Sequence, residues 1–203
     1  MTAVSHVDSR THAQAWSVVA AVAGVAGSVL VILFFRFGDA WGWPGPASDA
    51  AVAVQFAALA PVVRAVRRDL PDTRGVRIAT VTAFVACLVV AVLQALLAGG
   101  VLTFEAEIGP AVVAFLVVYA WLVVASLAAH RARSLPRPVT RAGLLVGVVF
   151  LVGLVFAGAG FLLPDPVGTA LSYIGYAVSG IGWLAFAFFP LLLASHVFTK
   201  EEP

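Results

Sequence analysis

The sequence predicts an all-α integral membrane protein, built as a bundle of six transmembrane helices. Two observations carry this prediction. The 203-residue chain is 62% hydrophobic and only 11% charged, whereas soluble domains carry about 25% charged residues. Its apolar residues also collect in runs close to or above the length of about 20 residues that crosses a bilayer. The length of these runs, without alternating polar residues, favours helices over barrel strands.

Six apolar runs follow one another along the chain. The predicted helices span residues 16–35, 50–66, 78–101, 108–129, 142–163 and 168–197. The second is short and contains Pro61, and the sixth is long enough to tilt, with Pro190 near its end. The first run is longer than a typical signal-peptide core and no clear cleavage site follows it, so we expect a retained helix. The predicted organisation is a cytoplasmic segment at 1–15, a transmembrane domain at 16–197 and a cytoplasmic tail at 198–203.

Basic residues collect on one side of the predicted membrane. Of the 12 Lys and Arg residues, only Arg36 falls on the other side if six helices alternate in direction. The opposite connections hold acids, among them Asp39 and Asp165. Because cytoplasmic loops collect Lys and Arg, we predict that both termini are cytoplasmic and that the chain lies in the cell inner (plasma) membrane. The chain is rich in Ala, Val, Gly and Arg residues, whose codons are GC-rich, and this indicates a GC-rich bacterial genome.

Two arginine-rich segments lie between predicted helices, RAVRRDLPDTRGVR and RARSLPRPVTR. They contain Arg64, Arg67, Arg68, Arg74, Arg77, Arg131, Arg133, Arg137 and Arg141. Nucleic acid could bind such clusters, but both segments are short, abut two helices and lack interleaved aromatic residues. We therefore predict contact with anionic lipid headgroups, at about 1 kcal/mol per basic residue near the surface, and no nucleic-acid partner.

The same two segments suggest an internal repeat. Leu70-Pro71 and Leu135-Pro136 each stand within an arginine cluster, 65 residues apart. One hypothesis is three repeated helical hairpins, at 1–70, 71–135 and 136–203. The alternative is chance similarity between apolar sequences of low complexity.

Small residues predict close packing of the last two helices. They are Gly143, Gly147, Gly153, Ala157, Gly160, Gly175 and Ser179. Small residues four apart let helices approach closely in lipid, where packing drives their association. We expect the fifth and sixth helices to pack tightly against each other.

Several polar side chains are predicted in the half of the bundle opposite the basic loops. They are Arg36, Gln55, Gln94, Glu105, Glu107, Tyr173 and Tyr176. Polar groups in hydrocarbon are costly and need a partner or a purpose. One interpretation is an outward pocket for a substrate or ion, in which Arg36 binds an anion and an acid binds a cation or relays a proton. The structural interpretation, which we favour, pairs Arg36 with Asp39 or Glu105 and bonds the glutamines between helices.

The sequence does not indicate a metal, a cofactor or a catalytic motif. His130 and His196 end two predicted helices at one depth, where they could ligate a metal or haem, but no acidic neighbour or paired-histidine motif supports this. The single cysteine, Cys87, excludes an internal disulfide and a CxxC site. No GxSxG, GxxxxGK[ST] or HExxH motif occurs.

These observations favour a non-catalytic multi-pass membrane protein, either an accessory or structural subunit or a small sensor. A first alternative is a small-solute or ion transporter that uses the outward pocket. A second is a lipid-modifying membrane enzyme, for which Glu105 with Arg36 or His130 is the starting point. The expected partners are anionic lipid headgroups at the cytoplasmic face and partner membrane subunits or further copies of the chain.

Overall fold

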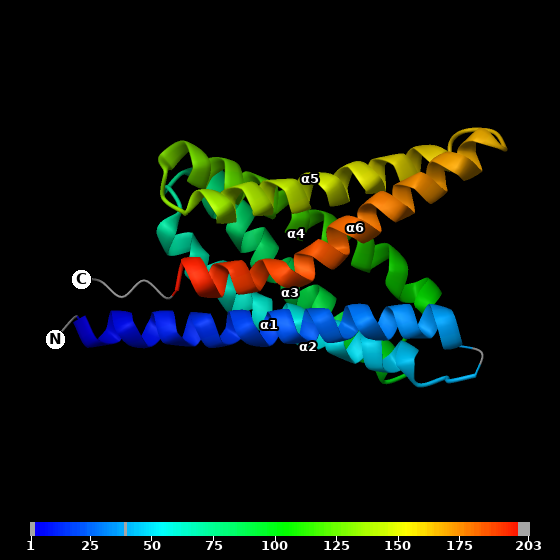
Figure 1. The fold of residues 1–203 in the computed structure, drawn as a ribbon, viewed down its shortest axis with the longest axis horizontal. Coiled ribbons are helices and arrows are strands. Elements are labelled where there is room, and N and C mark those ends of the chain that lie inside the picture. The colour runs from blue at the N-terminus through cyan, green and yellow to red at the C-terminus, as the bar shows by residue number, and fades with distance from the viewer. Residues whose placement is uncertain (1–2, 39, 199–203) are drawn as a thin grey trace.

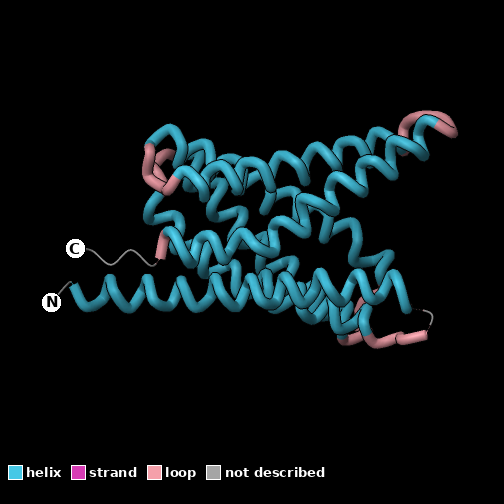
Figure 2. The backbone as a smooth tube through the Cα atoms, in the orientation of Figure 1, coloured by secondary structure: helices cyan, strands magenta, loops and turns pink. Residues whose placement is uncertain are grey.

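A computed structural model describes residues 3–38 and 40–198, and Figure 1 shows their fold. Over these residues the chain forms six α-helices and one short 3-10 turn, with no strand (Figure 2). The helices are α1 (Ala3–Phe37), α2 (Pro44–Val66), α3 (Arg74–Ala98), α4 (Phe104–Ala132), α5 (Arg137–Gly160) and α6 (Val167–His196). All six are long and apolar enough to cross a membrane, which confirms the predicted helical class.

The helices extend beyond the apolar runs that predicted them. The first begins at Ala3 instead of residue 16, and the second begins at Pro44 instead of residue 50. The predicted bounds follow hydropathy, whereas a helix satisfies its backbone internally in water as well as in lipid, so its ends continue into polar sequence. Pro44 suits the first turn of α2 because its missing N–H has no intrahelical partner there. Asp39 and Lys200 lie outside the described residues.

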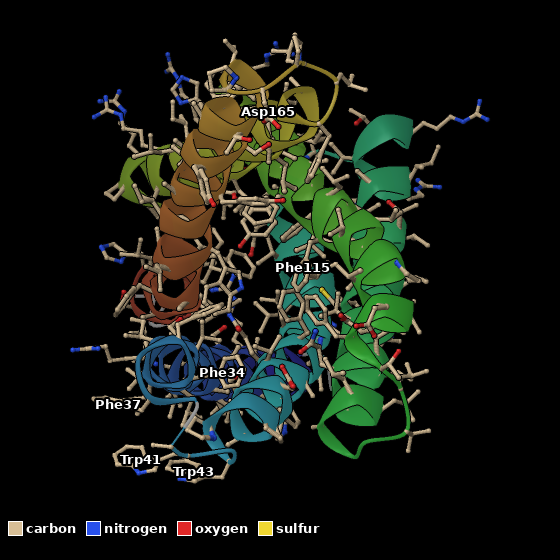
Figure 3. All side chains as sticks on the ribbon, turned by 90° about the vertical axis from the view of Figure 1, so that its right-hand side faces the viewer. Phe34, Phe37, Trp41, Trp43, Phe115 and Asp165 are labelled. Carbon is tan, nitrogen blue, oxygen red and sulfur yellow. The ribbon has the colours of Figure 1, made fainter. Side chains whose placement is uncertain are left out.

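The six helices form a closed ring. Each helix contacts its neighbours along the chain, and α6 returns to contact α1. Successive helices run in opposite directions, so α1 begins and α6 ends at the same end of the bundle (Figure 1). We call this the terminal end. The opposite end, which carries the α1–α2, α3–α4 and α5–α6 connections, is the distal end, and Figure 3 looks onto it.

Charge is segregated between the two ends of the ring. Every described arginine except Arg36 lies at the terminal end, as the alternation of helices predicts. In the α2–α3 connection Asp72 accepts hydrogen bonds from Arg67 and from Arg77, the latter at 3.0 Å from Nη2 to Oδ1. The hydrogen bond and charge of Arg77, with a smaller contribution from Arg67, hold the pKa of the Asp72 carboxyl below its usual range. This loop therefore neutralises part of its own positive charge.

Aromatic side chains fill the middle of the ring. Phe56 of α2 contacts Phe115 of α4 and Phe186 of α6, with ring centroids 5.3 and 6.0 Å apart. Tyr119 of α4 stacks on Phe150 of α5 with centroids 3.6 Å apart. Contacts among these rings bridge helices that are not neighbours in the ring, and aromatic pairs of this kind contribute about 0.5–1.5 kcal/mol beyond their buried area. The aromatic cluster therefore holds the ring together from inside.

The α5–α6 hairpin is packed backbone to backbone, as predicted. A Cβ added to Gly175 would lie 2.2 Å from the Ala157 nitrogen, and one added to Gly153 would lie 2.3 Å from the Ser179 nitrogen. Gly143 and Gly147 lie instead at the contact between α5 and α4, because a Cβ added to them would meet Ser126 and Val123 of α4, respectively. Towards the distal end the two helices leave the rest of the ring together (Figure 1).

Candidate functional site

A buried hydrogen bond joins two of the predicted polar residues. Gln94 lies one turn before the end of α3, and Glu107 lies in the first turn of α4. The Gln94 amide donates from Nε2 to Glu107 Oε1 at 2.7 Å, and the two residues are 8% and 2% exposed. The two residues occupy matching depths because the short α3–α4 connection makes these helices an antiparallel hairpin. Glu107 belongs to α4, whereas hydropathy predicts that the fourth helix begins at residue 108.

A second acid lies near this pair. Asp49 of α2 is half-buried, and its charge acts on the Glu107 carboxyl. The preceding residue, Ser48, is buried, and its hydroxyl donates to the Gly45 carbonyl oxygen at 2.7 Å. Gln94 of α3 and Glu107 of α4 thus form a buried amide–carboxyl pair near the distal end, with Asp49 on α2 at the same end. A carboxyl group buried at this depth in a membrane protein is the kind of group that exchanges a proton or binds a cation.

Gln55 lies apart from this group. It is 2% exposed and packs where α1, α2 and α6 meet. A Cβ added to Gly24 of α1 would lie 2.6 Å from Gln55 Nε2 and 3.2 Å from the Cα atom of Ala187 on α6. Gly24 therefore makes room for this side chain.

The other predicted pocket residues are exposed on separate helices. Arg36 is near the end of α1, with its guanidinium carbon 5.7 Å from the centre of the neighbouring Phe37 ring. Glu105 is exposed in the first turn of α4. Tyr173 and Tyr176 of α6 are 70% and 51% exposed. In Figure 3 Phe37, next to Arg36, lies at the opposite edge of the distal end from Asp165 in the α5–α6 connection.

The residues proposed for an enzyme site are also separated. Glu105 and His130 stand at opposite ends of α4, and 25 residues of α-helix extend about 37 Å. His130 is exposed, and His196 Nδ1 lies 2.8 Å from the Ser195 hydroxyl oxygen. Among the described residues no group of three or more His, Cys, Asp or Glu side chains is arranged to hold a metal ion.

The arginines of the basic loops differ in burial and in hydrogen bonding. Arg67 is half-buried, bonds to Asp72 and donates from Nη1 to the Leu70 carbonyl oxygen at 3.2 Å. Arg77 also bonds to Asp72. The other predicted lipid-contacting arginines are exposed at the terminal end, at positions 64, 68, 74, 131, 133, 137 and 141.

The hydroxyl of Tyr119 is a buried polar group that sequence reasoning missed. Tyr119 is fully buried in the aromatic cluster, and its hydroxyl is the one buried side-chain polar atom of the described residues without a hydrogen-bond partner. Such an unpaired group costs about 1–3 kcal/mol. An apolar run with a single tyrosine does not indicate that its hydroxyl lacks a hydrogen-bond partner. Whether a partner is present depends on how four helices meet.

Comparisons with protein-family models, curated proteins and solved structures found no match to this chain. Its functional interpretation therefore depends on the geometry of its own residues. Two features of that geometry stand out: the buried Gln94–Glu107 pair with Asp49 nearby, and the part of the α5–α6 hairpin that leaves the ring.

Proposed function

We propose that this chain is a non-catalytic multi-pass membrane protein of the plasma membrane, an accessory or structural subunit that acts through contacts between helices. The observation that carries this proposal is the distal part of the α5–α6 hairpin, which extends away from the ring (Figure 1). Close backbone packing makes the hairpin a stiff unit. A stiff projecting hairpin is suited to contact another membrane protein.

Where the hairpin extends away from the ring, one face of α6 is left uncovered. Near the middle of the bundle Ala187 lies against Gly24 of α1. Tyr176 precedes Ala187 by 11 residues, about three helical turns, and so lies on the same face of α6. At Tyr176 and Tyr173 this face is 51% and 70% exposed. Tyrosine supplies large contact area at a small entropic cost and is enriched at protein interfaces.

Photo-crosslinking in native membranes tests this function. A photoactivatable residue at position 176 should crosslink to one membrane protein that also co-purifies in a fixed ratio with the chain. Position 155, 66% exposed on α5 of the same hairpin, is the matched control. It lies roughly opposite Gly153 on the helix. Crosslinks to lipid alone, or equal products from both positions, would contradict the subunit proposal.

We propose in addition that both termini face the cytoplasm. The support is the collection of described arginines at the terminal end together with the tendency of cytoplasmic loops to hold basic residues. In a Cys87→Ala background, a cysteine at position 72 should react with an impermeant reagent only from the cytoplasm, and one at position 105 only from outside. The reverse pattern would overturn the orientation.

The threefold hairpin repeat remains part of the proposal. Leu70 is buried and Leu135 is packed against the core, and each is followed by a proline near the start of the next helix. The two prolines hold similar but not identical positions, because Pro136 is the N-cap residue of α5 and Pro71 lies two residues before Thr73, the N-cap residue of α3. The first of the three hairpins, at 1–70, would begin with α1.

A second candidate function is proton-linked transport through Glu107. The observation that favours it is the burial of this carboxyl between helices with Asp49 nearby. In vesicles that contain a pH-sensitive dye, Glu107→Gln should abolish a proton flux that Glu105→Gln leaves intact. Equal flux in the wild type and in Glu107→Gln would remove this candidate.

A further inference from the structure

A groove of about 580 Å³ runs between α1 and α6 in the half of the bundle near the terminal end. Gln14 and Val18 line it from α1, and Phe188, Leu191 and Ser195 line it from α6. The groove lies on the outside of the ring, between two helices that contact each other at Gly24 and Ala187. In a membrane this surface faces lipid.

The groove changes from polar to apolar along its length. Gln14 lies about 15 Å along α1 from Gly24, and Ser195 lies about 12 Å along α6 from Ala187, by the helical rise. These two polar residues are therefore at similar depth near the terminal end. Val18 and Leu191 lie deeper, at about 9 and 6 Å from the same level. An amphiphile with its polar part towards the terminal end matches this gradient.

The positive charge at the polar end favours an anionic amphiphile. Arg10, Gln14 and Val18 are four residues apart and share one stripe of α1. Arg10 is exposed about one turn beyond the groove's polar end. The Asp69 carboxylate interacts with both Arg10 and Arg68, so among these three described side chains one negative charge is set against two positive charges.

We propose that this groove is a binding site for an anionic phospholipid, with one acyl chain along Val18, Leu191 and Phe188 and the phosphate near Arg10 and Gln14. Its lining residues extend about 6 Å along α1, from Gln14 to Val18, and about 10 Å along α6, from Phe188 to Ser195. The groove therefore accommodates part of one acyl chain in the adjacent leaflet, whose hydrocarbon is about 15 Å thick. This site is independent of the projecting hairpin and of Glu107.

Lipid titration of the delipidated full-length protein by native mass spectrometry tests the site. Phosphatidylglycerol and phosphatidylcholine with identical acyl chains are the two probes. We expect the wild type to bind phosphatidylglycerol more tightly. Val18→Trp and Leu191→Trp, which fill the groove, should lose the first bound lipid, whereas Val81→Trp on the exposed surface of α3 should keep it.

The headgroup contact has its own pair of variants. Arg10→Gln should weaken the binding of phosphatidylglycerol about fivefold and leave phosphatidylcholine unchanged, because one basic residue near a charged headgroup contributes about that factor. Arg36→Gln, at the distal end, should change neither. The proposal is overturned if the wild type binds the two lipids equally, or if the two groove-filling variants bind lipid like the wild type. It is also overturned if these two variants convert a dimer of the chain to a monomer, because the groove would then be an interface between two copies.

Discussion

Replacing Gly175 with alanine should destabilise the protein by about 1–3 kcal/mol, the range for adding a methyl group to a packed site. The added Cβ would lie 2.2 Å from the nitrogen and 2.6 Å from the Cα atom of Ala157, and 2.6 Å from the Gly153 carbonyl oxygen. All three atoms belong to the backbone of α5, so no side chain can rotate to make room. The two helices must separate, and van der Waals contact is what holds helices together in lipid.

Gly180→Ala is the matched control on the same helix. A Cβ at Gly180 meets nothing within 4 Å, and alanine is a better helix former than glycine. This variant should be as stable as the wild type or slightly more stable. Cys87 of α3 is fully buried, so the temperature at which its thiol becomes reactive in detergent reports unfolding of the whole ring. Equal midpoints for the two variants would show that the close α5–α6 contact does not limit stability.

The glycine pattern shows how far sequence reasoning reaches for packing. Small residues four apart identified α5 as a helix that is closely approached. They assigned α6 as the partner of all these residues, which holds for Gly153 and Gly175, whereas Gly143 and Gly147 face α4. Spacing along one helix describes one face of that helix only. Which helix covers the face depends on the closure of the ring, and this depends on contacts between residues distant in the sequence.

The buried Gln94–Glu107 pair could almost be predicted. Both residues were singled out as candidates, and hydropathy placed the six helices correctly to within a few residues at most ends. Gln94 does bond between helices, as expected, but its partner was missed because the fourth apolar run begins at 108, so Glu107 was assigned to a loop. With α4 beginning at Phe104, both residues lie about one turn from the α3–α4 connection and face each other in an antiparallel hairpin. Hydropathy marks where the hydrocarbon begins and not where a helix begins.

Tyr119 and Gln55 mark the limit of that reasoning. Both are recognisable as polar residues inside apolar runs, but only Gln55 was predicted to line a pocket or to bond between helices. The environment of Tyr119 is built from α2, α4, α5 and α6. That of Gln55 is built from α1, α2 and α6. Neither environment has a periodic signature in the sequence.

Glu107→Ala should also lower stability, by about 1–3 kcal/mol, because it leaves the Gln94 amide buried without its acceptor. Hydrogen bonds between helices in membranes contribute about 0.6 kcal/mol on average, so most of the loss comes from the unpaired amide. Glu107→Gln keeps an acceptor oxygen in the same place and should unfold close to the wild-type temperature. Cys87 reactivity on heating measures all three proteins in the same way.

Glu105→Ala controls for the charge of Glu107. Both acids stand in the first turn of α4, where a negative charge favours the helix N-terminus by about 0.3–1 kcal/mol. Glu105 is exposed, so its replacement removes this contribution without leaving a buried partner. A loss in Glu105→Ala as large as that in Glu107→Ala would attribute the effect to the helix terminus and not to the buried hydrogen bond.

The comparison of alanine with glutamine at position 107 separates structure from transport. If Glu107 serves only to join α3 to α4, glutamine restores both stability and every activity of the protein, because it preserves the hydrogen bond. If Glu107 carries a proton, glutamine restores stability and abolishes flux, because an amide does not exchange a proton at neutral pH. A stable but inactive Glu107→Gln protein would therefore favour the transport candidate over a purely structural pair, since its folding has been verified independently.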